Sequence, residues 1–239
     1  MKFDDIKKLH QKKYREEFGH FLVEGEHLVL ELQKAAATQP ALRASKVYVA
    51  GAHENWQGPF EKHVVSNRRM EEMTETKTPQ GIVAVVPMVP AQAADKSERA
   101  IYLYEIQDPG NLGTILRTLA WFGGFRCLLS PGSVDPYNSK VIRATAGAIF
   151  HVAMEVDVPI ASLRERFGRI ACLDMQGRAL QSEDFGRQDC YVFGNEARGV
   201  PHAELASLEA QFFSIPGSGT IESLNVASAV NMCAYELNR

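Results

Sequence analysis

The feature that most constrains the fold is a regular alternation, after residue 98, of short apolar runs with helix-like segments. Strand-like runs such as IYLYEI, RCLLS, CYVFG and QFFSI alternate with segments that have helical spacing of apolar residues, such as NLGTILRTLAWFG. This alternation is typical of parallel strands joined by crossover helices. Because ligands bind beyond the carboxyl ends of such strands, the residues that follow each strand are the candidates for a functional site.

A linker-like stretch, PMVPAQAADKSER at 87–99, divides the chain. Before it, a basic helix-like opening at 6–17 precedes a second periodic stretch, HLVLELQKAAA, and the strand candidates KVYVA, HVV and GIVAVV. We therefore expect a small α/β unit over 1–90 and a larger α/β domain over 100–239.

Composition narrows the class of protein. The 26 Lys and Arg against 29 Asp and Glu give a net charge of −3, which argues against nucleic-acid binding by bulk charge alone and leaves room for a local basic patch. The 4 cysteines form no CxxC pair, which predicts buried thiols, and the 7 histidines show no ligand spacing, so no metal is expected. The opening residues lack a signal-peptide core and no apolar run is long enough to cross a bilayer, so we expect a cytoplasmic protein.

The loop after IYLYEI contains Pro109 and Gly110, which favour a tight turn, and then Asn111, which is a good N-cap for the following helix. Arg117 follows one turn after Gly113 on the same helical face. A helix start beside an arginine can grip a phosphate, although an ordinary capped helix with a solvent-facing arginine has the same pattern. The loop is not GxGxxG, so a dinucleotide enzyme lacks its fingerprint.

The loops after CYVFG and QFFSI are also rich in small and polar residues. Gly194 and Gly199 bracket a turn that holds Glu196 and Arg198, a pair that could bind a ligand or form only a surface salt bridge. The last loop, PGSGTIESLN at 216–225, has glycines that permit close approach of a ligand, and Ser223 is the expected N-cap of the final helix. Three such loops at strand ends predict one composite pocket.

Together these loops resemble the three signature motifs of the SpoU (TrmH-type) RNA ribose 2′-O-methyltransferases. The first motif is NLGTILR at 111–117, the second is VFGNEARGV at 192–200, and the third is IPGSGTIESLNVASAV at 215–230. They occur in the family's order. RATAGAIFHV and TPQGIVAVV extend the similarity to nearly the whole chain. Gly217 stands where the family often has Met, ASAV varies the usual run after SLNV, and Thr145 stands where Ser is common.

The resemblance implies a C-terminal, trefoil-knotted α/β methyltransferase domain with a parallel sheet, preceded by a smaller, ribosomal-protein-like domain that binds RNA. Because chains generally avoid knots, periodicity alone does not predict this topology. It further implies a homodimer through the C-terminal domain and S-adenosylmethionine bound by the last two loops. The cofactor-binding residues carried over from the motifs are Phe193, Gly194, Asn195, Gly199, Ile215, Gly217 and Leu224.

The catalytic residues implied by the resemblance are Asn111, Arg117, Glu196, Ser223 and Asn225. Family proposals make the arginine a base, but a guanidinium stays protonated with a pKa above about 12. We therefore expect Arg117 to fix the target phosphate and to stabilise developing oxyanion charge. Asn111 would orient Arg117 or the ribose, Glu196 would anchor Arg117 or a ribose hydroxyl, and the other two would complete the hydrogen bonds around the acceptor.

The expected substrate is structured RNA, with ribosomal RNA favoured over transfer RNA because the chain carries a full front domain. RNA contact is expected from the opening basic segment, with Arg68 and Arg69 as further candidates, although that segment can equally be the solvated side of an amphipathic helix. Its candidate residues are Lys7, Lys8, Lys12, Lys13 and Arg15. The rival hypothesis is a catalytically inactive RNA-binding or ribosome-assembly factor of the same fold.

Overall fold

The computed structural model describes residues 1–76, 78–89 and 98–239, so most of the predicted linker at 87–99 lies outside the described residues. The chain forms two compact units. The first comprises Met1–Pro90 together with Asp135–His151, and the second comprises Ala91–Val134 and Val152–Arg239. Each unit is described by itself below.

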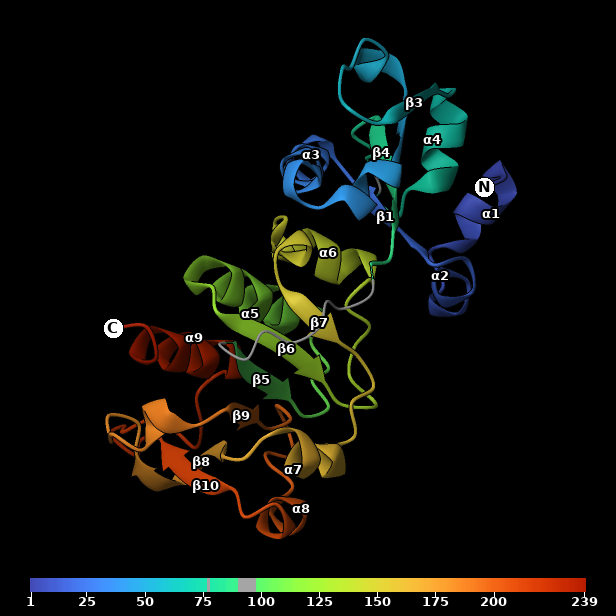
Figure 1. Ribbon diagram of the computed structural model, residues 1–239. Coiled ribbons are helices and arrows are strands. Elements are labelled where there is room, and N and C mark those ends of the chain that lie inside the picture. Colours follow the sequence, from blue (N-terminus) through green and yellow to red (C-terminus); the bar gives the residue numbers. More distant parts are fainter. Residues whose placement is uncertain (77, 90–97) are drawn as a thin grey trace. The chain divides into compact units, whose positions relative to one another are not determined.

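A sheet with six strands forms the centre of the second unit, in the order β10-β8-β9-β5-β6-β7 (Figure 1). Every pair of neighbours is parallel, which confirms the prediction from the alternating pattern. The strands are β5 (Arg99–Leu103), β6 (Phe125–Leu129), β7 (Ala153–Glu155), β8 (Ile170–Ala179), β9 (Cys190–Phe193) and β10 (Gln211–Ser214).

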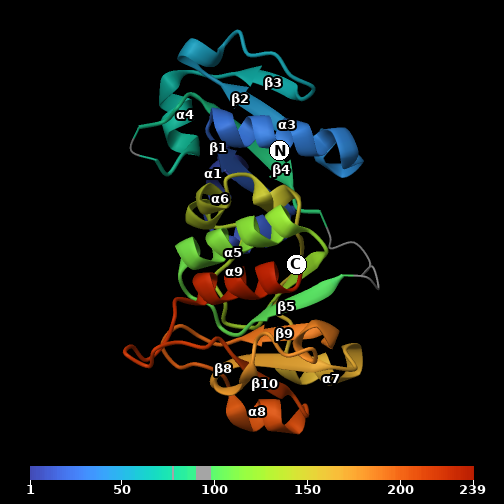
Figure 2. The ribbon, with the colours of Figure 1, turned by 90° about the vertical axis from the view of Figure 1, so that its left-hand side faces the viewer.

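Helices cover both faces of this sheet, and its central strands are therefore buried on both sides. α5 (Pro109–Phe122) and α9 (Val226–Glu236) lie side by side, as Figures 1 and 2 show. α7 (Leu163–Arg166) and α8 (His202–Ser207) contribute Leu163 and Leu205 to a core that also contains Tyr102 of β5. The apolar stripe predicted for the last helix is buried at Val230 and Cys233.

Two helices of this unit begin at different residues from those expected. The N-cap of α5 is Asp108 and not Asn111, because Pro109 suits the first helical position and the Asp108 carboxylate accepts the Asn111 N–H at 2.7 Å. The N-cap of α9 is Asn225 and not Ser223, since the Asn225 side chain accepts two backbone N–H groups of the first turn. The side chain of Asn111 is therefore not used as a cap.

The first unit has a mixed sheet with the strand order β1-β4-β2-β3, in which only β2 and β3 are parallel. Its strands are β1 (His20–Glu24), β2 (Lys46–Val49), β3 (Glu61–Val64) and β4 (Ile82–Pro87). Its helices are α1 (Phe3–Lys8), α2 (Lys12–Phe18), α3 (Glu26–Thr38), α4 (Asn67–Met73) and α6 (Ser139–Thr145).

The basic opening at 6–17 was expected to be one helix, and it forms two. α1 ends at a cap on Leu9, and Gln11 is extended before α2 begins. The break has a physical cause: Leu9 is buried, and its carbonyl accepts a hydrogen bond of 2.7 Å from the Arg15 guanidinium, so it does not continue the helical ladder.

The segment Asp135–His151 lies between β6 and β7 in sequence but belongs to the first unit. The Tyr137 and Phe21 rings have centroids 4.8 Å apart, and the Gln39 amide donates to the Phe150 carbonyl. The Thr145 hydroxyl donates to the Ile142 carbonyl at 2.7 Å. The hydroxyl common to Ser and Thr at this position thus closes the end of α6.

All 4 cysteines are buried and free, as predicted. Burial raises the pKa of the Cys127 thiol to about 12, which keeps it protonated and unreactive at neutral pH. Within the described ranges, no helix is both long and apolar enough to span a membrane.

Candidate active site

The three loops selected from the sequence meet at one cavity of about 530 Å³, at the carboxyl ends of the parallel strands. This volume is within the usual range for a small-molecule site. Ten of the predicted site residues line it: Asn111, Phe193, Gly194, Asn195, Glu196, Gly199, Ile215, Ser223, Leu224 and Asn225. The predicted composite pocket is therefore present.

Two predicted site residues do not line the cavity. Gly217 is exposed, and a Cβ built on it would meet no protein atom within 4 Å. Arg117 is exposed on α5 and makes no hydrogen bond or ion pair with the described part of the chain. Its guanidinium is thus available to an anion from outside the unit.

The structure adds a wall that the sequence reasoning missed, formed by Leu173, Asp174 and Met175 of β8. Asp174 directly follows the apolar run IACL at 170–173, which has the composition of a strand. The rule used for the other loops, that polar residues at strand ends are site candidates, would have selected it.

The second loop is a closed turn that depends on glycine. Asn195 and Gly199 exchange two backbone hydrogen bonds of 2.9 Å. A Cβ on Gly194 would lie only 2.4 Å from the Gly199 carbonyl carbon, and Gly199 itself has a φ of +68°. No other residue fits at Gly194 without opening the turn. The backbone of this loop can therefore approach a ligand closely.

The Asn195 side chain shapes this turn through three hydrogen bonds. Its Oδ1 accepts the N–H groups of Ala197 and Arg198 at 2.9 and 3.0 Å, and its Nδ2 donates to the Glu105 carbonyl at 2.7 Å. Asn195 was predicted to bind cofactor. The structure gives its side chain the different task of joining the second loop to the end of β5.

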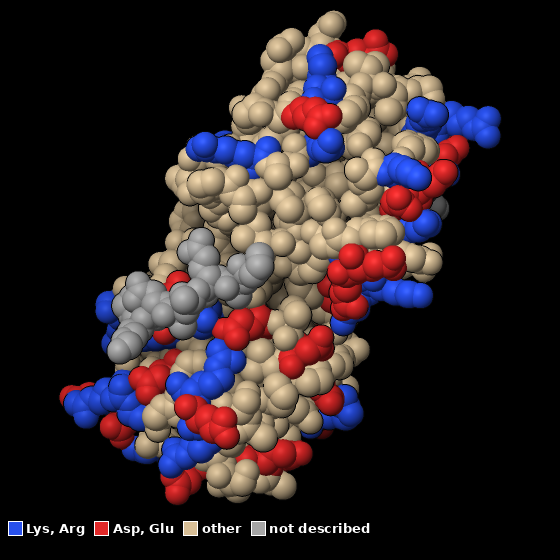
Figure 3. Space-filling model, turned by 45° about the vertical axis from the view of Figure 1, so that its right-hand side comes forward, with Lys and Arg blue, Asp and Glu red and all other residues tan. Residues whose placement is uncertain are grey.

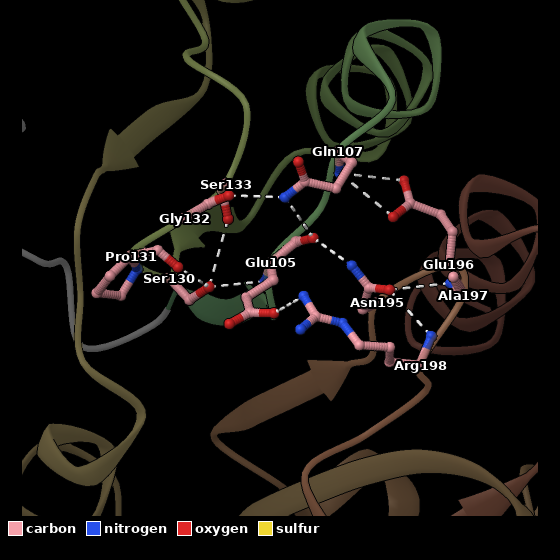
Figure 4. Close-up of polar contacts among 10 residues, drawn as sticks. All are labelled: Glu105, Gln107, Ser130, Pro131, Gly132, Ser133, Asn195, Glu196, Ala197 and Arg198. Carbon is pink, nitrogen blue, oxygen red and sulfur yellow. Dashed lines mark hydrogen bonds and ion pairs between the residues drawn. The ribbon is translucent and has the colours of Figure 1, made fainter.

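Glu105 is the hub of the polar network in Figure 4. Its φ of 47° is unusual for a residue other than glycine, and three contacts hold it. Its N–H donates to the Ser130 hydroxyl at 2.7 Å, its carbonyl also accepts from the Gln107 amide at 3.1 Å, and its carboxylate pairs with Arg198. The loops after β5, β6 and β9 are thereby held together. Arg198 pairs with Glu105 and not with Glu196, the acidic residue in its own loop.

A chain of hydrogen bonds links all three motif loops. Glu196 accepts the N–H groups of Gln107 and Asp108 at 3.2 and 3.3 Å, and the Asn111 amide at 3.2 Å. Asn111 Oδ1 in turn accepts from Asn225 Nδ2 at 2.9 Å. Glu196 therefore anchors the first loop. It does not contact Arg117, although anchoring Arg117 was one of its two predicted roles.

This chain of hydrogen bonds fixes the orientation of the Asn111 and Asn225 side-chain amides. Asn225 Oδ1 caps α9, so its Nδ2 must face Asn111, and Asn111 Nδ2 must then face Glu196. Each NH₂ group has two hydrogens, and only one of them takes part in this chain of hydrogen bonds. Asn111 and Asn225 thus present one further N–H each at the cavity that they both line.

The lining of the cavity is chemically suited to S-adenosylmethionine. Phe193, Ile215 and Leu224 give it apolar surface for a purine ring, and Gly194 and Gly199 of the closed turn also line it. Acidic side chains in the lining suit a cationic ligand. Within the described residues, no group of three or more His, Cys, Asp or Glu is placed to hold a metal ion.

Comparison with known proteins decides the family. Residues 98–235 match the model of the SpoU rRNA methylase family, and residues 2–84 match the MRM3-like substrate binding domain. The chain belongs to the SpoU family. It is an S-adenosylmethionine-dependent RNA methyltransferase, as the motifs implied.

Relatives of the whole chain support this assignment to the SpoU family. The chain is 32% identical to the 23S rRNA (guanosine(2553)-2′-O)-methyltransferase RlmP of Bacillus subtilis, over 99% of this chain and 95% of RlmP. A TrmH-family structure from Porphyromonas gingivalis has a TM-score of 0.83 with 28% identity and covers 99% of this chain and 96% of its own.

A further solved structure shares both the fold and the ligand class. The AdoMet-bound rRNA methyltransferase from Sinorhizobium meliloti has a TM-score of 0.80 with 25% identity and covers 98% of this chain and 93% of its own. These likenesses and the parallel sheet give the SpoU chain the trefoil-knotted α/β fold with an N-terminal substrate-binding domain, which confirms the expected fold class.

The predicted RNA-binding segment of the first unit is largely neutralised by its neighbours. Lys7 Nζ lies 3.1 Å from Glu72, Lys8 Nζ lies 2.9 Å from Asp5, and Lys12 Nζ lies 3.6 Å from Glu16. The Glu72 hydrogen bond raises the pKa of Lys7. Lys13 lies over the Tyr14 ring at 5.6 Å. On the face in Figure 3, basic and acidic side chains are interspersed and do not form one basic patch.

Arg15 does not fit its predicted role in RNA binding. Its side chain is 6% exposed, and its guanidinium pairs with Asp135 and donates to the Leu9 carbonyl. Sequence reasoning placed it with the lysines because Asp135 is remote in sequence. We conclude that Arg15 joins α2 to the segment Asp135–His151 within the first unit.

Proposed function

We propose that this chain transfers the methyl group of S-adenosylmethionine to a ribose 2′-OH in structured RNA, with ribosomal RNA favoured over transfer RNA. The observation that carries the proposal is the hydrogen-bond chain from Glu196 through Asn111 to Asn225 at the edge of the cavity. It offers oriented N–H donors to an acceptor oxygen. The 2′-O specificity of RlmP supports the same reaction.

The second and third loops would hold the cofactor, which supplies an activated methyl group on its sulfonium. Phe193, Gly194, Ile215 and Leu224 line the cavity, and backbone groups around them would bind the adenosine and methionine parts. Asn195 would act through the shape of the turn, which three hydrogen bonds of its side chain hold.

Methyl transfer to a hydroxyl is an in-line displacement, so alignment of the acceptor is the main task of the protein. The spare N–H groups of Asn111 and Asn225 would orient the ribose, and Ser223, which also lines the cavity, would add a hydroxyl. Arg117 is unpartnered among the described residues and would bind the neighbouring phosphate. The negative charge of this RNA phosphate would attract the Arg117 guanidinium.

The hydroxyl proton has to leave, and neither Arg117 nor Glu196 is suited to accept it. Arg117 stays protonated at neutral pH. The Glu196 oxygens are occupied by three N–H donors from the first loop. We therefore assign proton loss to water or an RNA phosphate, with the oxyanion stabilised by nearby donors.

The match of residues 2–84 to a substrate-binding domain supports RNA contact by the first unit, to which Lys7, Lys8, Lys12 and Lys13 would contribute. A homodimer through the C-terminal domain would cover exposed apolar side chains of α5 and α9. Trp121 is 84% exposed and Tyr235 is 61% exposed. A cytoplasmic location would accompany a ribosomal substrate.

The test is to map ribose methylation in total RNA from a strain that lacks this gene, using the resistance of 2′-O-methylated linkages to alkali. We expect one lost modification, in ribosomal RNA, that returns with the wild-type gene and not with Arg117→Ala. An unchanged methylation map, with a defect in ribosome assembly that Arg117→Ala repairs, would instead identify an inactive assembly factor.

A further inference from the structure

Asp174, on the wall of the cavity that the motifs do not cover, has no task in the mechanism above. It lies in β8, two residues after the last buried residue of that strand, Cys172, and its side chain is 16% exposed. A carboxylate that is mostly removed from water and faces a ligand cavity acts on the ligand with little screening.

Both oxygens of Asp174 already have partners in the protein. Oδ1 accepts the Gln176 N–H at 2.8 Å, and Oδ2 lies 3.3 Å from Nε2 of His202, whose ring stacks on Phe212 with centroids 5.6 Å apart. These contacts hold the carboxylate in place. Asp174 therefore acts on a ligand mainly through its fixed negative charge, and less through hydrogen bonds.

The lining of the cavity is asymmetric in charge. It includes the carboxylates of Asp174, Glu196 and Glu222, and none of its described members is a Lys, Arg or His. Glu196 is tied to three N–H donors of the first loop, and Glu222 is exposed on the third loop. Asp174 is thus the carboxylate of the lining that is both shielded from water and not used by the motif loops.

We propose that Asp174 makes this pocket discriminate by charge, so that the methyl donor with its sulfonium cation binds more favourably than the product, which lacks that charge. This rests on the proposed function, in which the cavity holds S-adenosylmethionine. The donor and S-adenosylhomocysteine share the adenosine, the ammonium and the carboxylate, and they differ by the methyl group and the sulfonium charge. A fixed carboxylate favours only the charged form, and its attraction is lost when the methyl group leaves.

The test measures the dissociation constants of three ligands by calorimetry, for the wild-type protein and for Asp174→Asn. The ligands are S-adenosylmethionine, S-adenosylhomocysteine and sinefungin, which carries an amine in place of the methylated sulfur. We expect Asp174→Asn to weaken S-adenosylmethionine and sinefungin by about five- to tenfold and S-adenosylhomocysteine by less than about twofold. Equal weakening of all three would show that Asp174 holds their shared part, and would overturn charge discrimination. An unchanged set of constants would overturn it as well.

Matched variants exclude indirect effects. Glu222→Gln removes a charge from the same cavity at an exposed position, and we expect less than about a twofold change for each ligand. Glu183→Gln removes a charge that is 90% exposed and outside the lining, and it should change nothing. His202→Gln should keep the discrimination, because the charge of Asp174 remains. Loss of the discrimination in Glu183→Gln would attribute it to net charge and contradict the proposal.

Asp174→Ser gives a second route if the Asn variant does not fold, since a serine hydroxyl can still accept the Gln176 N–H without a charge. Thermal unfolding of each variant checks the fold. If the wild-type protein bound none of the three ligands, the proposed function itself would fail. Failure of the Asp174 inference alone is recognised by normal wild-type binding with equal losses in the variant.

Discussion

The three motif loops of the second unit and the basic opening of the first unit were both predicted as functional, and the structure treats them differently. In the loops, polar groups distant in sequence converge, and Asn111, Asn225 and Arg117 keep donors free. In the opening segment, Lys7 and Lys8 are paired with carboxylates, and Arg15 is buried against Asp135. In a parallel sheet the loops after the strands meet at one edge, so the sequence predicts that their polar residues lie together. Whether a basic side chain is free to bind RNA depends on neighbouring carboxylates, which the sequence does not show.

The sharpest test of the free donors in the loops is Arg117→Ala. We expect methyl transfer to fall by about 10²- to 10³-fold, because a charge-assisted contact to the target phosphate is lost, while cofactor affinity stays within about twofold. Single-turnover transfer and calorimetry measure the two quantities. Arg117→Lys keeps the charge without the planar fork and should recover part of the rate. A normal rate in Arg117→Ala would remove this side chain from the site.

The closed turn of the second loop is tested by Gly194→Ala. The added Cβ would lie 2.4 Å from the Gly199 carbonyl carbon, so the turn must open. We expect S-adenosylmethionine affinity to fall more than about tenfold, as measured by calorimetry. Gly186→Ala is the matched control, because its Cβ meets no atom within 4 Å. Equal affinities in both variants would show that the turn does not shape the pocket.

The hydrogen-bond chain between the loops is tested at Asn225, which both caps α9 and donates to Asn111. Asn225→Asp keeps the capping oxygen and loses the donor, and Asn225→Ala loses both. We expect each to reduce transfer by about tenfold or more, and only Ala to lower the free energy of unfolding, by about 1 kcal/mol. Denaturant titration separates the two effects. Full activity in Asn225→Asp would contradict a role for the donated N–H.

The smallest effect is expected in the opening segment. Lys12→Ala combined with Lys13→Ala should weaken RNA binding by only about two- to threefold and lower the slope of log affinity against log salt by at most about 2. Cofactor binding should not change. Lys34→Ala, at an exposed lysine of α3 paired with Glu31, serves as the control. An RNA affinity that is unchanged across a salt titration would exclude the two lysines from the RNA footprint.

The parallel sheet and the composite pocket were predictable because alternating patterns and strand-end loops follow from local sequence. Helix boundaries were harder to predict. Asp108 and Asn225 cap their helices in place of the expected Asn111 and Ser223, because two residues that can act as an N-cap lie close together at the start of each helix. Asp174 was missed because only the loops after three of the strands were searched for polar residues.

Contacts distant in sequence account for the remaining differences. Arg15 is buried by Asp135, and its bond to the Leu9 carbonyl accompanies the break between α1 and α2. The segment Asp135–His151 belongs to the first unit, although its sequence lies between two strands of the second. The knot was predicted only from the family resemblance, because no local sequence pattern indicates that one segment of the chain passes through a loop formed by another.

The most direct test of the central claim is mass spectrometry of nucleosides from ribosomal RNA of the deletion strain, after incubation with the purified protein and methyl-labelled S-adenosylmethionine. The account predicts one labelled nucleoside with the methyl group on the ribose 2′ oxygen, absent when the Arg117→Ala variant is used. Label on a base, or equal labelling by the variant, would contradict it.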